Sequence, residues 1–279
     1  MYYLNQYFDS KSGANASANI IAAIQSNHLF WPLLVPTEAT EEEKQKIFME
    51  LNEDYNNIIS GFYWGEYIDC MHNIWKRLKD SSLEEKLNSY DERAYYINTL
   101  FFQAIGNIAR KTAEYQQKRV VDRRKFERLS RYSYCFGMGL QLVNDIADFV
   151  PPEMNEGATG KESTDSHNDI ENGKMTPPII YMLEMANQED RKRVIDCLEN
   201  GFNSPPEQLR QTTDIFIRSG AYSMCRRVCR KYKKECVEMA RGFEESFHFL
   251  LNRSSLILDA NRYFRSLTKL KNKKLKGDG

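Results

Sequence analysis

Glycine and proline are scarce in this chain and fall in a few places, so the residues between them form long uninterrupted segments. The sequence has 14 glycines and 8 prolines among 279 residues, and these two residue types most often end helices. Apolar residues recur at helical spacing within the segments, as at Ile20, Ile24, Leu29 and Leu33. No alternating apolar–polar pattern bounded by hairpin turns is found. The sequence therefore predicts an all-α fold.

The positions of the helix-ending signals divide the chain into predicted helices. These are expected over residues 19–34, 41–78, 83–114 (as one or two helices), 123–149, 178–200, 206–219, 222–251 and 256–270. Gly137 and Gly139 lie inside one predicted helix, where glycine usually marks close packing against another element. We expect a single helical domain over residues 1–271 and a basic flexible tail over 272–279.

Charge and cysteine usage narrow the class of protein. Lys plus Arg equals Asp plus Glu at 39 each, so the net charge predicts no nucleic-acid partner and no attraction to an anionic membrane. No apolar run is long enough to span a membrane, and the start has no signal-peptide pattern. Six cysteines without a CxxC pair indicate a reducing, cytoplasmic location.

One local concentration of positive charge stands out against this balance. It consists of Arg226, Arg227, Arg230, Lys231, Lys233 and Lys234. The simplest interpretation is a solvated helix face, and the alternative is a partner surface.

The segment from Gln141 to Asp148 carries the chemistry. Gln141, Asp145 and Asp148 follow the spacing i, i+4, i+7 and so line one helix face, which Asn144 borders. The neighbouring residues are apolar, so the helix is otherwise suited to burial. Buried polar groups need a partner, and carboxylates that face phosphate oxygens are typical Mg²⁺ ligands. Taken alone, the stripe could equally be a solvated face.

The polar stretch that follows favours the metal hypothesis. It contains two Gly-Lys pairs ending at Lys161 and Lys174, with Asp169 between them and Thr176-Pro177 after them. Lysine ammonium groups neutralise phosphate oxygens as point charges. The polar stretch runs from Glu153 to Lys174. A loop of about twenty residues inside a compact domain more often has a function than not.

This order of residues resembles the second aspartate-rich region of trans-isoprenyl diphosphate synthases, the polyprenyl synthetase family. Gly65 to Asp69 resembles the family's GQxxD segment, and Asn98-Thr99 resembles its Lys-Thr pair. The resemblance implies an isoprenoid-synthase helical bundle and a Mg²⁺-dependent transferase acting on a prenyl diphosphate. It implies catalytic roles for Asn144, Asp145 and Asp148. The implied metal ligands are Asp9, Asp145 and Asp148, and the implied diphosphate ligands are Thr99, Gln141, Lys161, Asp169 and Lys174.

The chain also departs from the family pattern. The first aspartate-rich motif is reduced to Asp9, and the helices and basic segment expected before it are missing. Asparagine stands at family charge positions, at Asn5, Asn27, Asn98 and Asn144. Each replacement removes a charge that would contact metal or phosphate.

Several functions remain open at this stage. The chain is expected to be a working prenyltransferase, or alternatively a catalytically degenerate regulatory subunit of a heteromeric synthase, or a terpene-cyclase-like enzyme. A shortened version of a normal synthase is a further interpretation, but it leaves Asn98 and Asn144 unexplained. A helical adaptor leaves the segment from Gln141 to Pro177 unexplained. The family's usual homodimer, or a heteromer with a motif-complete synthase, is the expected assembly.

Overall fold

A computed structural model describes residues 39–70, 74–118, 120–150 and 167–259, and every regular element in these ranges is a helix. The all-α prediction is therefore confirmed. Asp9, the predicted helix over 19–34, Lys161 and the tail 272–279 lie outside the described residues. No helix among the described residues is both long and apolar enough to cross a membrane.

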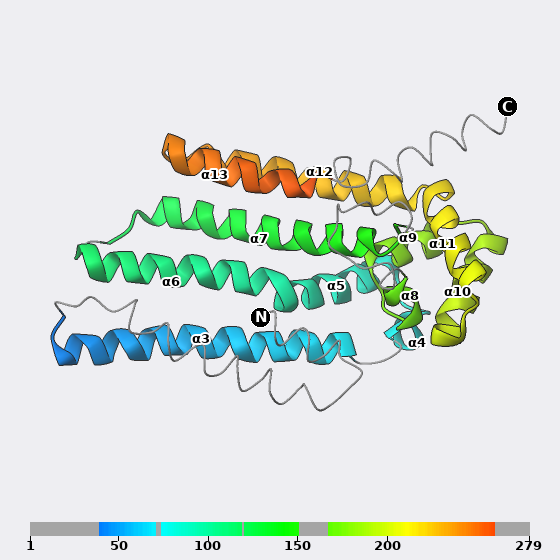
Figure 1. Cartoon of the computed structure of the whole chain (residues 1–279), viewed down its shortest axis with the longest axis horizontal. Helices are drawn as coiled ribbons and strands as arrows, with labels where there is room; N and C mark the ends of the chain where they lie inside the picture. Colours follow the sequence, from blue (N-terminus) through cyan, green and yellow to red (C-terminus); the bar gives the residue numbers. More distant parts are fainter. Residues whose placement is uncertain (1–38, 71–73, 119, 151–166, 260–279) are drawn as a thin grey trace.

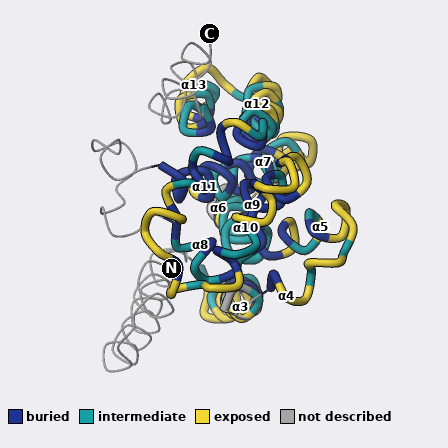
Figure 2. The backbone as a smooth tube through the Cα atoms, turned by 90° about the vertical axis from the view of Figure 1, so that its right-hand side faces the viewer, coloured by how far each residue is buried: buried dark blue, intermediate teal, exposed yellow. Residues whose placement is uncertain are grey.

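Four layers of antiparallel helices form the body of the molecule (Figure 1). From one edge to the other, they are α3 (Glu41–Cys70), then α6 (Leu100–Gln117), then α7 (Arg123–Ala147), and finally the pair α12 (Ala221–Ala240) and α13 (Glu245–Ser255). The same order is visible in the perpendicular view (Figure 2). Helix α5 (Leu83–Ala94) joins α6 through a π-helical turn at Tyr95–Thr99.

Shorter helices gather at one end of these layers, around the C-terminal end of α7 (Figure 1). They are α4 (Ile74–Leu78), α8 (Asn168–Glu171), α9 (Pro177–Met185), α10 (Gln188–Asn200) and α11 (Pro206–Arg218). The largest apolar cluster lies here, where the Phe149 and Phe216 rings pack 5.0 Å apart and Phe216 meets Tyr222 at 5.6 Å. Burial of these aromatic side chains fixes the chain immediately after α7.

The helix starts follow from local capping. Ser82 and Glu85 form a reciprocal capping box at α5, since the Glu85 N–H donates to the Ser82 hydroxyl and the Ser82 N–H to the Glu85 carboxylate. Asn187 caps α10 in the same way through the Asp190 N–H. α9 begins at two prolines, where the missing N–H groups have no helical partner to lose.

The single helix predicted over residues 222–251 is wrong: it is two helices that form a hairpin. The Arg128 guanidinium, from α7, donates to the carbonyls of Glu238 and Met239 and so satisfies the end of α12. Gly242 makes this possible, because a Cβ there would lie 2.2 Å from Arg128 Nε. The apolar spacing continues across the turn, so periodicity alone did not reveal it.

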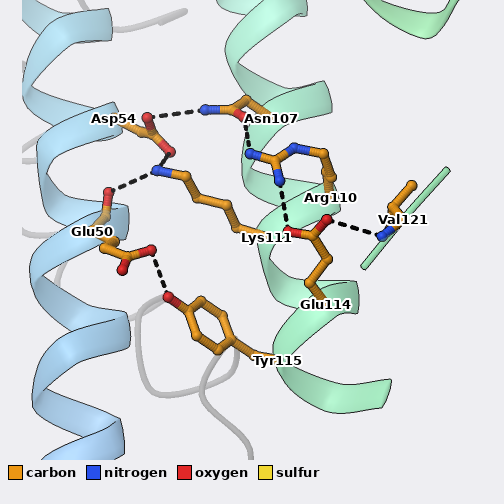
Figure 3. A network of polar contacts seen from close by, with 8 residues as sticks. All are labelled: Glu50, Asp54, Asn107, Arg110, Lys111, Glu114, Tyr115 and Val121. Carbon is orange, nitrogen blue, oxygen red and sulfur yellow. Dashed lines mark hydrogen bonds and ion pairs between the residues drawn. The ribbon is translucent and has the colours of Figure 1, made fainter. Parts of the chain in front are cut away.

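Polar contacts hold much of the outer layer α3 against α6 (Figure 3). The Lys111 ammonium lies 2.8 Å from Asp54 Oδ2, and the Tyr115 hydroxyl donates to Glu50 Oε2 at 2.5 Å. Among the described side chains, Ile47 and Leu51 form a small buried apolar cluster at this junction, and Ile108 and Tyr115 pack against it. Burial, followed by the Glu50 contact, raises the pKa of Tyr115 to about 12, so this hydroxyl stays a donor at physiological pH.

Close packing at the two glycines of α7 was predicted and is confirmed. A Cβ at Gly137 would lie 2.7 Å from Thr99 Cα, and one at Gly139 would lie 3.0 Å from the Leu258 methyl carbons. The contact at Gly137 is the less tolerant of an added methyl group, because the atom that it would meet belongs to the backbone and cannot rotate away. It lets the π-helical turn touch α7 directly, one turn before Gln141.

We therefore expect Gly137→Ala to destabilise the fold by about 1–3 kcal/mol, because the added methyl must push α7 away from Thr99. Gly106→Ala on α6 is the matched control. Its Cβ would meet nothing closer than 3.8 Å, so the gain in helix propensity should stabilise the protein by roughly 0.5–1 kcal/mol. Urea unfolding of both variants measures the difference, and equal effects would contradict this account of the contact.

Candidate functional site

Two buried carboxylates lie at the C-terminal end of α7, on the one face that the spacing predicted, so they do not belong to a solvated face. Asp145 is in the last turn with 2% of its surface exposed, and Asp148 follows the helix with 1% exposed. Gln141 is half-buried on the same face, whereas Asn144 is exposed beside it. Carboxylates are unfavourable at this end of a long helix, because the macrodipole is negative there. The location therefore favours a nearby cation.

A chain of amide hydrogen bonds orients Asp145. Asn98 Nδ2 donates to Gln141 Oε1 at 3.1 Å, and Gln141 Nε2 donates to Asp145 Oδ1 at 2.9 Å. The other carboxylate oxygen, Oδ2, is buried and accepts no hydrogen bond of ordinary geometry from the described residues, although the Tyr90 hydroxyl lies near this carboxylate. A buried acceptor in this state is costly unless a ligand satisfies it.

Asp148 connects α7 to the segment that resumes after the undescribed residues. Its Oδ2 accepts the backbone N–H of Asp169 at 3.1 Å, and its carbonyl accepts the N–H of His167 at 2.8 Å. The Lys174 N–H donates to the Asp169 carbonyl at 2.8 Å, and Lys174 Nζ lies 3.9 Å from Asp169 Oδ1. The structure thus brings Asp169 and Lys174 to the carboxylate end of α7.

His167 anchors this segment. The Thr213 hydroxyl donates to the Phe149 carbonyl at 3.1 Å, so its oxygen is left to accept from His167 Nε2 at 3.0 Å. This arrangement assigns the proton to Nε2. His167 is buried in a left-handed backbone conformation with φ of 66°. We interpret it as a structural residue, since its ring serves a packing and anchoring contact.

Thr99 lies close to α7 but is not open to solvent. It is fully buried against Gly137, and its hydroxyl has no hydrogen-bond partner among the described residues. The π-helical turn that carries it places Asn98 and Thr99 opposite α7. Such turns are frequent at functional sites. Thr99 therefore lies behind Gln141 rather than beside the carboxylate oxygens.

Sequence reasoning missed Tyr90 and Arg93, which α5 places next to Asp145. Both are buried, and the Arg93 guanidinium lies over the Tyr90 ring at 5.4 Å from its centre. With Lys86, which pairs with Glu184 at 3.0 Å, they follow the spacing i, i+4, i+7. The spacing argument that placed Gln141, Asp145 and Asp148 on one face would also have placed these three residues on one face of α5.

Burial sets the charge state of Asp145. It raises the pKa of this carboxyl to about 7, and the negative charge of Asp169 acts in the same direction. The Arg93 guanidinium and the Tyr90 and Gln141 side chains lower the pKa, but by less. The balance shows that the charge from Arg93 does not compensate for burial of the carboxylate. A further cation at Asp145 Oδ2 would stabilise its ionised form.

The donor set suits Mg²⁺ held jointly with a phosphate ligand. Within the described ranges, no three His, Cys, Asp or Glu side chains gather closely enough to form a metal site by themselves. Mg²⁺, however, usually takes one or two protein carboxylates and completes its shell with waters and substrate phosphates. The unsatisfied Asp145 Oδ2, with Asp148 one turn away, fits that mode.

Comparison with known proteins gives a family match, a sequence relative and two similar solved structures. The family model described as polyprenyl synthetase matches residues 14–215. A short chain isoprenyl diphosphate synthase of Methanothermobacter thermautotrophicus is 26% identical over 167 residues, which is 60% of this chain and 48% of the relative. The match thus spans about half the length of that relative.

Two solved structures show the same arrangement of helices. A decaprenyl diphosphate synthase from Rhodobacter capsulatus has a TM-score of 0.68 and 12% identity, covering 94% of this chain and 75% of that one. A geranylgeranyl pyrophosphate synthase from Corynebacterium glutamicum, complexed with isoprenyl diphosphate and magnesium, has a TM-score of 0.66 and 12% identity. It covers 88% of this chain and 62% of that one. These likenesses show the isoprenoid-synthase fold.

We expect Asp145→Asn to stabilise the metal-free protein at pH 8, by a few kcal/mol at most. The folded state holds the Asp145 proton more tightly than the unfolded state, because the folded pKa is raised from 3.8 to about 7. Raising the pH through this interval therefore favours unfolding, and the variant should lose this dependence. Thermal unfolding in chelator between pH 4 and pH 8 measures it.

Asp190→Asn is the control with the opposite sign. The hydrogen bonds from Arg218 lower the pKa of Asp190, so its ionised form stabilises the fold at neutral pH. Removing it should destabilise the protein at pH 8. An unchanged pH dependence in Asp145→Asn would contradict the buried, unsatisfied carboxylate.

Proposed function

The chain belongs to the polyprenyl synthetase family, and from that premise we propose that it is a Mg²⁺-dependent prenyltransferase acting on allylic prenyl diphosphates. The observation that carries the proposal is the buried pair Asp145 and Asp148 at the negative end of α7, with one carboxylate oxygen unsatisfied. A cation and an anionic ligand together would satisfy this end of the helix.

We assign the metal ligands to Asp145 and Asp148, with Asp9 as a ligand from the undescribed segment. Mg²⁺ held there would neutralise charge on the diphosphate as it leaves. Asn98 and Gln141 keep Asp145 Oδ1 occupied, so that Oδ2 is directed to the ligand. Asn98 stands where the family pattern has a lysine. In this proposal its side chain orients Gln141 through a hydrogen bond instead of contacting phosphate with a positive charge.

We assign binding of the diphosphate oxygens to the lysines in the segment that follows α7. Lys174 is positioned by its backbone bond to Asp169, and its ammonium group lies near that carboxylate. Lys161 and Gln141 complete the proposed set, whereas Thr99 is buried against Gly137 and is not assigned to it. Cys225 and Cys229 of α12 are buried next to Asp145 of α7. Their apolar side chains would help to exclude water from a reactive allylic centre.

Two alternatives remain within this proposal. A degenerate regulatory subunit is supported by asparagine at 98 and 144, and by the exposed apolar side chains Met49, Trp64 and Tyr67 of α3, which could pack on a second subunit. A homodimer or a heteromer with a motif-complete synthase would use the same helix. A terpene-cyclase-like enzyme needs a single diphosphate, so the reduced first motif weighs less against it.

A cytoplasmic location forms part of the proposal as well. Its support is chemical: Cys135, Cys197, Cys225, Cys229 and Cys236 are all buried free thiols. Free thiols persist in a reducing compartment.

We expect the purified chain to extend labelled geranyl or farnesyl diphosphate with isopentenyl diphosphate when Mg²⁺ is present. Asp145→Ala and Asp148→Ala should lower the rate on the order of a hundredfold or more. Glu92→Ala is the control, since it removes an exposed carboxylate from α5. Longer diphosphates indicate a synthase, and released hydrocarbon indicates a cyclase. No turnover from folded protein, together with co-purification of an active synthase, would replace the enzyme proposal by the subunit alternative.

We also expect Asn144→Asp to lower the Mg²⁺ concentration needed for half-maximal activity severalfold. Asn144 is exposed beside the acidic face, so a third carboxylate there strengthens cation binding with little cost to folding. Asn56→Asp adds the same charge on the distant α3 and should leave the Mg²⁺ requirement unchanged. An identical Mg²⁺ titration for wild type and Asn144→Asp would argue against a metal at this end of α7.

A further inference from the structure

The exposed face of α12 carries a row of cations. Arg227, Arg230, Lys231, Lys234 and Arg241 are all exposed and are spaced i, i+3, i+4, i+7 and i+14. At 100° per residue they centre on the side opposite the buried Cys225, Cys229 and Cys236, which pack inward. The row is about 21 Å long at 1.5 Å per residue.

These cations are not consumed by internal ion pairs. None of the five makes an ion pair or side-chain hydrogen bond with another described residue. The acids and bases nearby are paired elsewhere: Glu235 binds Arg131 at 2.5 Å, and Lys233 binds Asp259 at 2.9 Å. Glu238 is the one acid on the cationic face of α12. On a chain of zero net charge, this is a marked separation of charge.

The surface is also hollowed. A groove of about 280 Å³ runs along α12 and is lined by Arg230, Lys233, Lys234, Val237, Glu238 and Arg241. Its lining therefore combines four cations with the apolar stems of long side chains.

Exposed apolar side chains flank the cations. On α13, Phe249 and Leu250 expose 60% and 59% of their surface, and Phe247 is also exposed. α12 and α13 form the outermost layer of the molecule in both views (Figures 1 and 2). Cations and large apolar groups thus lie on the two helices of the same outer layer, with the cations on the side of α12 opposite the cysteines that lie beside Asp145.

We propose that this α12–α13 surface binds the anionic face of a lipid bilayer. The cations complement acidic headgroups, and the exposed apolar groups of α13 can enter the headgroup–acyl boundary. Nucleic acid would use the cations but leaves Phe249 and Leu250 without a partner, so the bilayer is the better match. The inference rests on the surface alone. If the proposed function also holds, the bilayer is where an apolar prenyl product can be released.

The test is co-sedimentation of the full chain with vesicles of phosphatidylcholine, with and without phosphatidylserine. We expect binding only when phosphatidylserine is present, and weaker binding as ionic strength rises. The triple variant Arg227→Glu, Lys231→Glu, Lys234→Glu should bind at least about tenfold more weakly. The matched control Lys76→Glu, Lys79→Glu, Lys192→Glu changes net charge equally at exposed sites elsewhere and should bind like wild type.

Phe249→Ser with Leu250→Ser should also weaken binding while retaining its salt dependence. Circular dichroism establishes that each variant is folded. Equal binding to neutral vesicles, equal losses in both triple variants, or no binding by wild type would overturn the proposal. So would a nucleic acid that displaces the vesicles at comparable affinity. Asp145→Ala should bind vesicles normally, which keeps this result separate from the outcome of the turnover assay.

Discussion

The direct contact between Gly137 of α7 and the π-helical turn at Thr99 is the packing constraint on which the site depends. Because no side chain separates the two backbones, Asn98 reaches Gln141 and α5 brings Arg93 to Asp145. The segment from Arg93 to Thr99 therefore runs antiparallel to the segment of α7 from Gly137 to Asp145. A glycine in the middle of a helix destabilises that helix relative to alanine. Here the packing of α7 against Thr99, which only glycine permits, offsets that cost.

Burial of Asp145 and Asp148 then creates an unfavourable concentration of negative charge. Desolvation, the negative end of α7 and neighbouring Asp169 all disfavour the ionised carboxylates, whereas Arg93 offsets only part of this. A site that is electrostatically incomplete without a cation is suited to reversible binding of a metal with an anionic substrate. Asn98 and Asn144 are neutral, so the charge balance around Asp145 depends on Asp148, Asp169 and Arg93.

The two faces of the molecule differ in how charge is handled. At the α7 site, the charged groups are buried and oriented by hydrogen bonds, so that small displacements change their energy strongly. On α12 the cations are exposed and lack partners among the described residues, so they act together at longer range and are sensitive to salt. The two regions can therefore be altered independently by mutation.

The sequence by itself determined the helical class, the ranges of α7 and α11 to within two residues, the family, and the alignment of Gln141, Asp145 and Asp148 on one face, whereas the ranges 178–200 and 222–251 each proved to be two helices. These follow from local rules, since helical periodicity depends only on residues a turn or two apart. Tertiary structure decided that Asn144 faces outward, that α12 and α13 form a hairpin at Gly242, and that Tyr90 and Arg93 lie beside Asp145. Residues 93 and 145 are far apart in the chain, and their meeting depends on how closely two helices pack. That distance is set by the contact of Gly137 with Thr99: the sequence predicted close packing at Gly137, but no local pattern identified Thr99 as its partner.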